Sequence, residues 1–267
     1  MSSFSTPAIV LRRINFGDYD LIINFFTLNK GKISVIAKSA KKSVKRFSGV
    51  LELFSVLEVV CSSGRGKGLP VLQEAALKQP FAKIRTDIVN IAYASYWAEL
   101  INVWMEDGKQ QVQTYQLFQH VLGELDFGNI SRDALSIIFQ IRFMKLSGFC
   151  PDLTQCGNCR VEVEEIKKGK IAFDIVKGCF ICDRCSSARS GKIYLSKGTI
   201  KQLLWVESGD LKKAGRIRFT KTALSEGLKF LEAFVPYHLG MEPRSLKFLR
   251  QIRSRGDHKD RPYEKTI

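Results

Sequence analysis

Two pairs of closely spaced cysteines are the residues of this chain whose types and spacing point most directly to chemistry. Six of its seven cysteines lie between Cys150 and Cys185, and four of them form the pairs Cys156–Cys159 and Cys182–Cys185. Each Cys-x-x-Cys pair turns tightly and offers two thiolates to one ion, so two pairs at this separation are typical of tetrahedral zinc. The sequence therefore predicts one structural Zn²⁺, because four thiolates leave no position open for a catalytic water.

The second pair has an alternative register. Cys179 and Cys182 also form a Cys-x-x-Cys and can replace Cys182 and Cys185 as ligands, while Cys150 is a further spare thiol. Buried, reduced thiols without a metal are the plain alternative. We favour metal over disulfides because the N-terminus does not have the pattern of a signal peptide, which predicts an intracellular, reducing location.

A dense run of cations is the second candidate site. Five basic residues fall within nine positions: Lys38, Lys41, Lys42, Lys45 and Arg46. Arg12 and Arg13 belong to the same part of the chain and extend this basic patch. Such a loop can neutralise successive phosphates and release their counterions, which gives affinity for nucleic acid of any sequence. An ordinary solvated charge run is the alternative.

Aromatic side chains near the basic run can stack on unpaired bases. The candidates are Phe16, Phe25, Phe26 and Phe47. Most phenylalanines at strand spacing belong to a core, so we predict only Phe47, which directly follows the cations, as a base contact.

A second group of cations lies near the C-terminus. Arg244, Lys247 and Arg250 follow one another at helical spacing and share one face, with Arg253 and Arg255 beyond them. This face suits DNA or an acidic segment of a partner, and a solvated helix face is an equal alternative.

The pattern of a catalytic site is missing from the sequence. The three histidines are scattered, and neither a GxxxxGK[ST] phosphate loop nor a GxGxxG fingerprint occurs. Asp18 and Asp20 are paired acids, but two carboxylates alone are weak grounds for a metal-dependent nuclease. We therefore expect a binding protein rather than an enzyme.

The elements that position these residues follow from the hydrophobic pattern. Short strands separated by glycine turns are expected at 8–11, 21–27, 33–37, 51–61 and 69–76, the second and third as a hairpin. Five such strands suit a small closed barrel such as the OB-fold. Helical spacing then predicts helices at 88–104, 112–125, 131–147, 196–206 and 220–239.

The predicted fold class is α+β, an N-terminal OB-fold β-barrel followed by an α-helical domain with an inserted four-cysteine zinc ribbon. We place the barrel at residues 1–80, the helical domain at 81–253, the ribbon at 150–191 and a disordered tail at 254–267.

Charge and hydropathy limit the partners. The 42 Lys and Arg against 26 Asp and Glu give a net charge of +16, which favours polyanions such as nucleic acid. No apolar run is long enough to cross a membrane, so we expect no membrane association and a cytoplasmic, nucleoid-associated location.

A further pattern in the chain is an ordered set of short motifs: Gly17-Asp18-Tyr19-Asp20, Phe26-Thr27, Gly31 to Lys38, Lys45-Arg46-Phe47, Leu51 to Phe54, Gly148 to Cys159, Gly178 to Cys185, Tyr237 to Gly240 and Arg244 to Leu249. In this ordered set, the chain resembles the bacterial RecO family of recombination mediators and DNA-repair proteins. The family usually has glycine where this chain has Cys179, which favours Cys182 and Cys185 as the second ligand pair.

The resemblance implies an OB-fold, a helical domain with an inserted zinc ribbon, and binding of single- and double-stranded DNA. It also implies annealing of complementary strands, and cooperation with RecR and single-stranded-DNA-binding protein in loading the recombinase RecA. The alternative function is an RNA-binding accessory protein, since OB-folds and zinc ribbons serve there too.

Overall fold

The computed structural model describes residues 3–43, 46–62, 68–128, 130–167, 169–185 and 192–259, without the side chains of 212 and 256–259. The chain forms two compact units. Met1–Phe127 together with Arg244–Ile267 make the first unit, and Gly128–Pro243 make the second.

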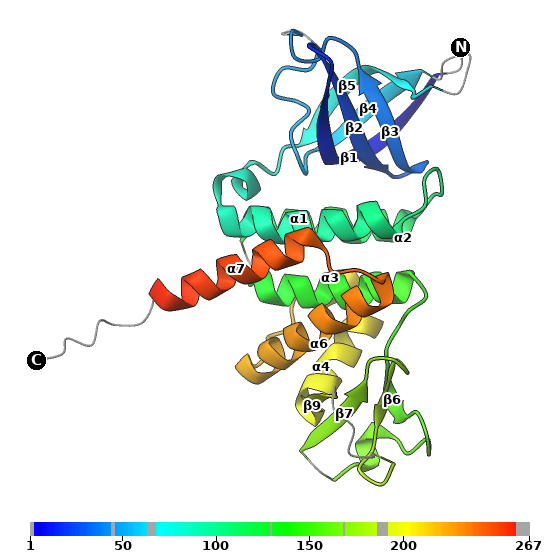
Figure 1. Cartoon of the computed structure of the whole chain (residues 1–267), viewed down its shortest axis with the longest axis vertical. Coiled ribbons are helices and arrows are strands. Elements are labelled where there is room, and N and C mark those ends of the chain that lie inside the picture. The colour runs from blue at the N-terminus through cyan, green and yellow to red at the C-terminus, as the bar shows by residue number, and fades with distance from the viewer. Residues whose placement is uncertain are drawn as a thin grey trace, which may run out of the picture. The chain divides into compact units, whose positions relative to one another are not determined.

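The first unit contains a closed five-stranded barrel with strand order β1-β2-β3-β5-β4 (Figure 1). Its strands are β1 (Ser3–Phe16), β2 (Asp20–Thr27), β3 (Gly31–Ala37), β4 (Val56–Ser62) and β5 (Val71–Gln79). Alternate side chains of each strand point inward and form an apolar core that includes Val10, Ile23, Phe25 and Val35. This architecture confirms the predicted OB-fold barrel.

The fourth strand begins later than the sequence pattern predicts. Residues 51–55 were expected to be extended, but Phe54 has a φ of +70° and the strand starts at Val56. Phe54 is buried, and its N–H donates to the carbonyl of Val10 beside the β-bulge of β1. The segment therefore closes one end of the barrel instead of lengthening a strand.

The predicted hairpin of β2 and β3 is confirmed, and its turn is held by Thr27. The Thr27 hydroxyl accepts a hydrogen bond from the Lys30 N–H at 3.1 Å and donates to the Gly31 carbonyl at 2.8 Å. Gly31 has a φ of +61°, and a Cβ there would overlap the backbone carbonyl of Lys109. Glycine is thus required at this position for both backbone and steric reasons.

Three helices and a 3₁₀ turn accompany the barrel in the first unit. They are η1 (Ala82–Thr86), α1 (Ile88–Trp104), α2 (Val112–Phe127) and α7 (Arg244–Lys259). The Asp87 carboxylate caps α1 by accepting the N–H groups of Val89 and Asn90. Figure 1 shows α7 alongside α1, where Leu246 and Leu249 are buried.

The start of α7 is fixed by Glu99 on α1. The Glu99 carboxylate accepts hydrogen bonds from the backbone N–H groups of Arg244 at 3.2 Å and Ser245 at 2.8 Å. A carboxylate at a helix N-terminus satisfies free donors and complements the helix dipole. The predicted disordered tail, 254–267, is wrong as far as Lys259, because the helix continues to that residue. The remainder of the tail lies outside the described residues.

The second unit combines a four-stranded sheet with helices. Its elements are α3 (Arg132–Leu146), β6 (Asp152–Cys156), η2 (Val163–Glu165), β7 (Lys170–Asp174), β8 (Cys179–Ile181), β9 (Ile193–Ser196), α4 (Lys197–Ser208), α5 (Leu211–Ala214) and α6 (Lys221–Leu239). The sheet has the order β6-β8-β7-β9. Phe173 of β7 packs edge-on against Phe230 and Phe234 of α6, with ring centroids 4.6 and 5.8 Å apart.

The five helices expected from the sequence are all present, and the Ser131 side chain caps α3 by accepting a hydrogen bond from the Ala134 N–H. The predicted domain boundaries at 80 and 253 stay a prediction, although compactness groups α1, α2 and α7 with the barrel. Within the described residues, no helix has both the length and the apolar character needed to span a bilayer.

Substituting Gly31 tests the close approach of the Lys109 carbonyl. Gly31→Ala should destabilise the protein by about 1–2 kcal/mol for the left-handed backbone and by a further ~1–3 kcal/mol of overpacking. Gly17→Ala is the matched control, since Gly17 has a φ of +56° but an added Cβ there would meet nothing within 4 Å. Urea unfolding measures both, and equal losses of stability would refute the steric argument.

Candidate metal centre and nucleic-acid interface

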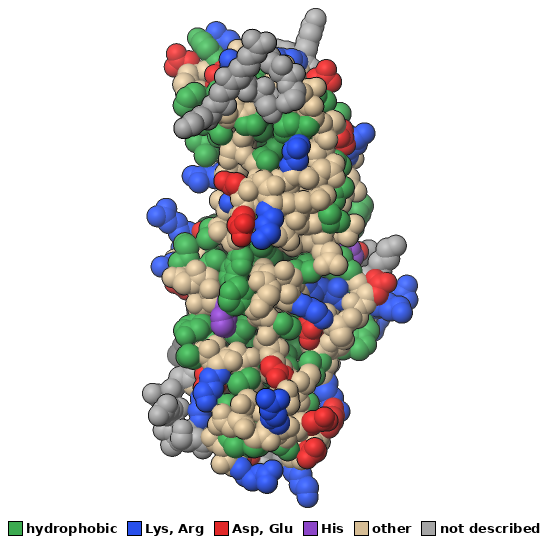
Figure 2. Space-filling view, turned by 90° about the vertical axis from the view of Figure 1, so that its right-hand side faces the viewer, with side chains coloured by type: hydrophobic (Ala, Val, Ile, Leu, Met, Phe, Trp, Pro, Cys, Tyr) green, Lys and Arg blue, Asp and Glu red, His purple; other side chains and the backbone are tan. Residues whose placement is uncertain are grey.

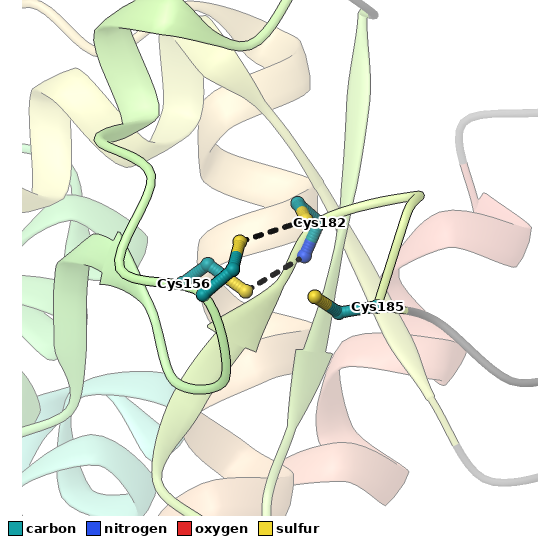
Figure 3. A group of neighbouring side chains, drawn as sticks. Cys156, Cys182 and Cys185 are labelled. Atoms are coloured by element: carbon teal, nitrogen blue, oxygen red, sulfur yellow. Dashed lines mark hydrogen bonds between the residues drawn. The ribbon is translucent and has the colours of Figure 1, made fainter.

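Four cysteines of the ribbon meet at one point in the second unit. Cys156 ends β6 and Cys159 follows in a tight turn, while Cys182 and Cys185 come directly after β8. Their four sulfur atoms all lie within 4.8 Å of one another, and Figure 3 shows three of these side chains converging. Zn–S bonds of about 2.3 Å in a tetrahedron place sulfur atoms about 3.8 Å apart. The cluster therefore has the dimensions needed to hold a metal ion.

Backbone N–H groups stabilise a thiolate in the cluster, which is the form that attracts a cation. The Cys182 N–H donates to the Cys156 sulfur at 3.4 Å, and the Cys159 and Cys182 sulfurs lie 3.5 Å apart. Burial raises the pKa of Cys156, but backbone N–H groups from Cys159 and Cys182 outweigh it and lower the pKa to about 6. Cys156 is therefore a thiolate at neutral pH, which is the form that binds metal.

Cys185 differs from Cys156 in its protonation. Hydrogen bonds with the thiols of Cys159 and Cys182 raise the pKa of Cys185 to about 12. A metal ion that binds the four sulfurs would displace this proton, since a thiolate is the ligand form.

The structure separates the two spare thiols from the cluster. Cys179 lies in β8, buried, with its sulfur against the backbone of Gly157. Cys150 is exposed and precedes β6. Within the described part of the chain, the group of potential metal ligands contains Cys185 and not Cys179, so the geometry favours the Cys182–Cys185 register.

The cations of the basic run lie in the loop after β3, in the first unit. Lys38, Lys41, Lys42 and Arg46 are exposed, whereas Lys45 lies outside the described residues. Arg12 and Arg13 are exposed on β1, and Arg13 forms an ion pair of 2.9 Å with Glu52. Surface pairs of this kind are weak, so Arg13 stays available to a phosphate.

This loop is docked on the turn between β1 and β2. The Ser39 N–H donates to the Asp20 carboxylate at 2.7 Å, and the Lys41 N–H donates to the Tyr19 carbonyl at 3.0 Å. The Lys41 ammonium reaches the Gly17 carbonyl at 3.1 Å, and the Lys42 ammonium lies 3.4 Å from the centre of the Tyr19 ring. Lys41 and Lys42 are thus held against this turn.

Sequence reasoning did not find the role of this turn. Asp20 was considered only as half of a weak carboxylate pair, and it instead holds the backbone of Ser39. Ser39 has a φ of +56°, a conformation that a serine adopts only where its surroundings stabilise it. The signal available in the sequence was the Gly17-Asp18-Tyr19-Asp20 motif, whose partner segment could not be recognised without the register of the strands.

The prediction that Phe47 contacts bases is wrong. Phe47 is 4% exposed and belongs to the barrel core, with the Arg46 guanidinium over its ring. Phe25 and Phe26 are also buried, whereas Phe16 is 50% exposed. Of the four phenylalanines considered, Phe16 is therefore the one that can meet a ligand.

The C-terminal cations occupy the exposed face of α7. Arg244, Lys247 and Arg250 are exposed, while Leu246 and Leu249 face α1. On the molecular face seen in Figure 2, Lys and Arg side chains are spread out with acidic side chains among them. The net charge alone therefore does not locate an interface, and the docked basic loop is the more specific feature.

Two family models together cover almost the whole chain. The model described as "Recombination protein O N terminal" matches residues 1–81, and "Recombination protein O C terminal" matches residues 85–247. The chain belongs to the recombination protein O family. The two matches meet between the barrel and α1, and this membership supports a role in DNA repair and recombination.

Curated relatives agree over nearly their full length. The chain is 43% identical to DNA repair protein RecO of Desulfosudis oleivorans over 95% of this chain and 99% of that protein. It is 44% identical to DNA repair protein RecO of Desulfatibacillum aliphaticivorans, over 96% of this chain and 99% of that protein. It is also 31% identical to DNA repair protein RecO of Syntrophus aciditrophicus, over 96% of this chain and 98% of that protein.

Removing single cysteines tests the metal centre. We expect the purified protein to contain one zinc ion per chain by elemental mass spectrometry, and Cys156→Ser or Cys185→Ser to lose it. Cys150→Ser and Cys179→Ser should keep the metal, because neither sulfur belongs to the cluster. Loss from Cys179→Ser with retention in Cys185→Ser would instead establish the other register.

Proposed function

We propose that this chain is a non-enzymatic DNA-binding and strand-annealing recombination mediator. The observation that carries the proposal is the basic loop docked on the turn between β1 and β2, at one end of a barrel of the OB type. Membership of the recombination protein O family also supports a role in DNA repair and recombination. The proposed DNA contacts are Lys38, Lys41, Lys42, Lys45, Arg46, Arg12 and Arg13.

The proposed mechanism is electrostatic. Two DNA strands that approach one another repel through their phosphates, and a protein that neutralises both lowers this barrier. The hydrogen bonds of the Ser39 and Lys41 backbone hold the start of the loop in place, so Lys41 and Lys42 lose less conformational entropy on binding. Annealing by this route needs neither nucleotide hydrolysis nor a catalytic residue.

The proposed partners are RecR and single-stranded-DNA-binding protein, and the proposed outcome is loading of the recombinase on coated DNA. These proposals rest on the family resemblance, and we assign no contact residues to them.

The proposed metal is a single structural Zn²⁺ held by Cys156, Cys159, Cys182 and Cys185. Four soft thiolates favour zinc over hard cations, and the ion supplies cross-linking of the two turns rather than reactivity. Apolar contact of Phe173 on β7 with Phe230 on α6 holds the ribbon in addition.

Charge reversal in the loop tests the DNA interface. Lys41→Glu with Lys42→Glu should weaken binding of single-stranded DNA and reduce the slope of log K against log salt by about 1.4, or about 0.7 per lost phosphate contact. Lys78→Glu with Lys83→Glu is the matched control, since both lysines are exposed in the same unit and the change in net charge is equal. If the two double variants behave alike, the loop is not the interface.

An annealing assay tests the mechanism. Complementary DNA strands coated with single-stranded-DNA-binding protein should anneal faster when this protein is added, without ATP, and the loop variant should lose the acceleration. If the protein accelerates annealing of naked strands only, the proposed cooperation with single-stranded-DNA-binding protein is wrong. A preference for RNA of the same sequence would favour the RNA-binding alternative.

A further inference from the structure

Two large aromatic side chains stand exposed beside the docked basic loop. Phe16 ends β1 and is 50% exposed, and Tyr19 lies in the following turn and is 46% exposed. Both belong to the first unit, where Phe25, Phe26 and Phe47 are by contrast buried. Exposed rings of this size are costly to leave in water and mark a contact surface when they adjoin other apolar groups.

An apolar row adjoins these rings on the outside of the barrel. Side chains alternate along β1, so Ile14 and Phe16 share its outer face. Ile14 is paired with Ile22 on β2, Ile22 with Ile36 on β3, and Ile36 with Val71 on β5. All four members of this row are only partly buried. The row therefore crosses four neighbouring strands and remains partly open to solvent.

Cations lie beside the row on two of its four strands. Arg12 lies two residues before Ile14 and is exposed on the same outer face of β1. Lys38 lies two residues after Ile36 and opens the basic loop. An apolar surface bordered by cations is complementary to a chain that alternates flat apolar groups with anions, which describes single-stranded nucleic acid.

Tyr19 links the aromatic and basic parts. The Lys42 ammonium lies over its ring at 3.4 Å, a cation–π contact that holds the cation beside the ring. Because the Tyr19 residue is still 46% exposed, its side chain remains accessible to a second planar group.

We propose that Phe16 and Tyr19, with the adjoining row of isoleucines, form a base-stacking surface that makes the interface select unpaired strands. The inference rests on the proposed DNA-binding function, and it adds the residues that distinguish unpaired strands from duplex DNA. Duplex DNA keeps its bases stacked inside, so it can engage the cations but not the rings. Unpaired bases can engage both.

The decisive comparison uses an oligonucleotide and an abasic strand of equal length and charge. The intact protein should bind the base-bearing strand more tightly than the abasic strand. Phe16→Ala and Tyr19→Ala should each weaken binding of the base-bearing strand about tenfold, while affinity for the abasic strand and for duplex, and the salt slope, stay unchanged. Tyr19→Trp, which keeps a ring, should retain the preference even if Tyr19→Ala disturbs the position of Lys42.

Phe127→Ala is the matched control, since Phe127 is the exposed phenylalanine at the end of α2 in the same unit and should have no effect. The inference is overturned if the variants of Phe16 and Tyr19 keep the full preference for base-bearing strands. It is also overturned if they lose affinity for abasic strands equally. The failure of the DNA-binding proposal itself is distinguishable, because then the loop variant with Lys41→Glu and Lys42→Glu would keep its affinity and salt slope.

Discussion

Closure of the five-stranded barrel determines which side chains of the first unit can meet a partner. Each strand gives one face to the core, so half of the barrel side chains are committed to packing. Closure also gives each strand a neighbour on both sides, with β3 and β5 meeting at Ile36 and Val71, which disfavours edge pairing as a mode of recognition. Recognition is left to the outward faces of the strands and to the loops at the ends, where Lys41, Lys42 and Phe16 lie.

The same constraint explains which predictions from the sequence succeeded. The apolar runs at 21–27 and 33–37 stand on either side of a glycine turn and indicate two paired strands, so the hairpin and the barrel could be predicted. The cysteine spacing was equally informative, because four residues suffice to define the cluster. The prediction that Phe47 contacts bases failed because a position next to cations does not show which way the side chain points. The Phe47 ring lies in the barrel core.

The docking of the basic loop was beyond sequence reasoning for a different physical reason. Its contacts join backbone N–H groups to the Asp20 carboxylate and the Tyr19 carbonyl, and such bonds depend on the register of strands far apart in the chain. Ser39 even takes a left-handed conformation where its N–H meets the Asp20 carboxylate. Composition describes what a segment can do in isolation, whereas these contacts belong to the assembled barrel.

The return of α7 to α1 has a consequence for biosynthesis. Glu99 and Ser245, which the helix contact joins, are 146 residues apart in the chain. During translation the surface of α1 that receives Leu246 and Leu249 stays uncovered until the whole second unit has been made. Along the chain, the second unit is thus inserted between two parts of the first. On the ribosome, the unit that starts first is completed last.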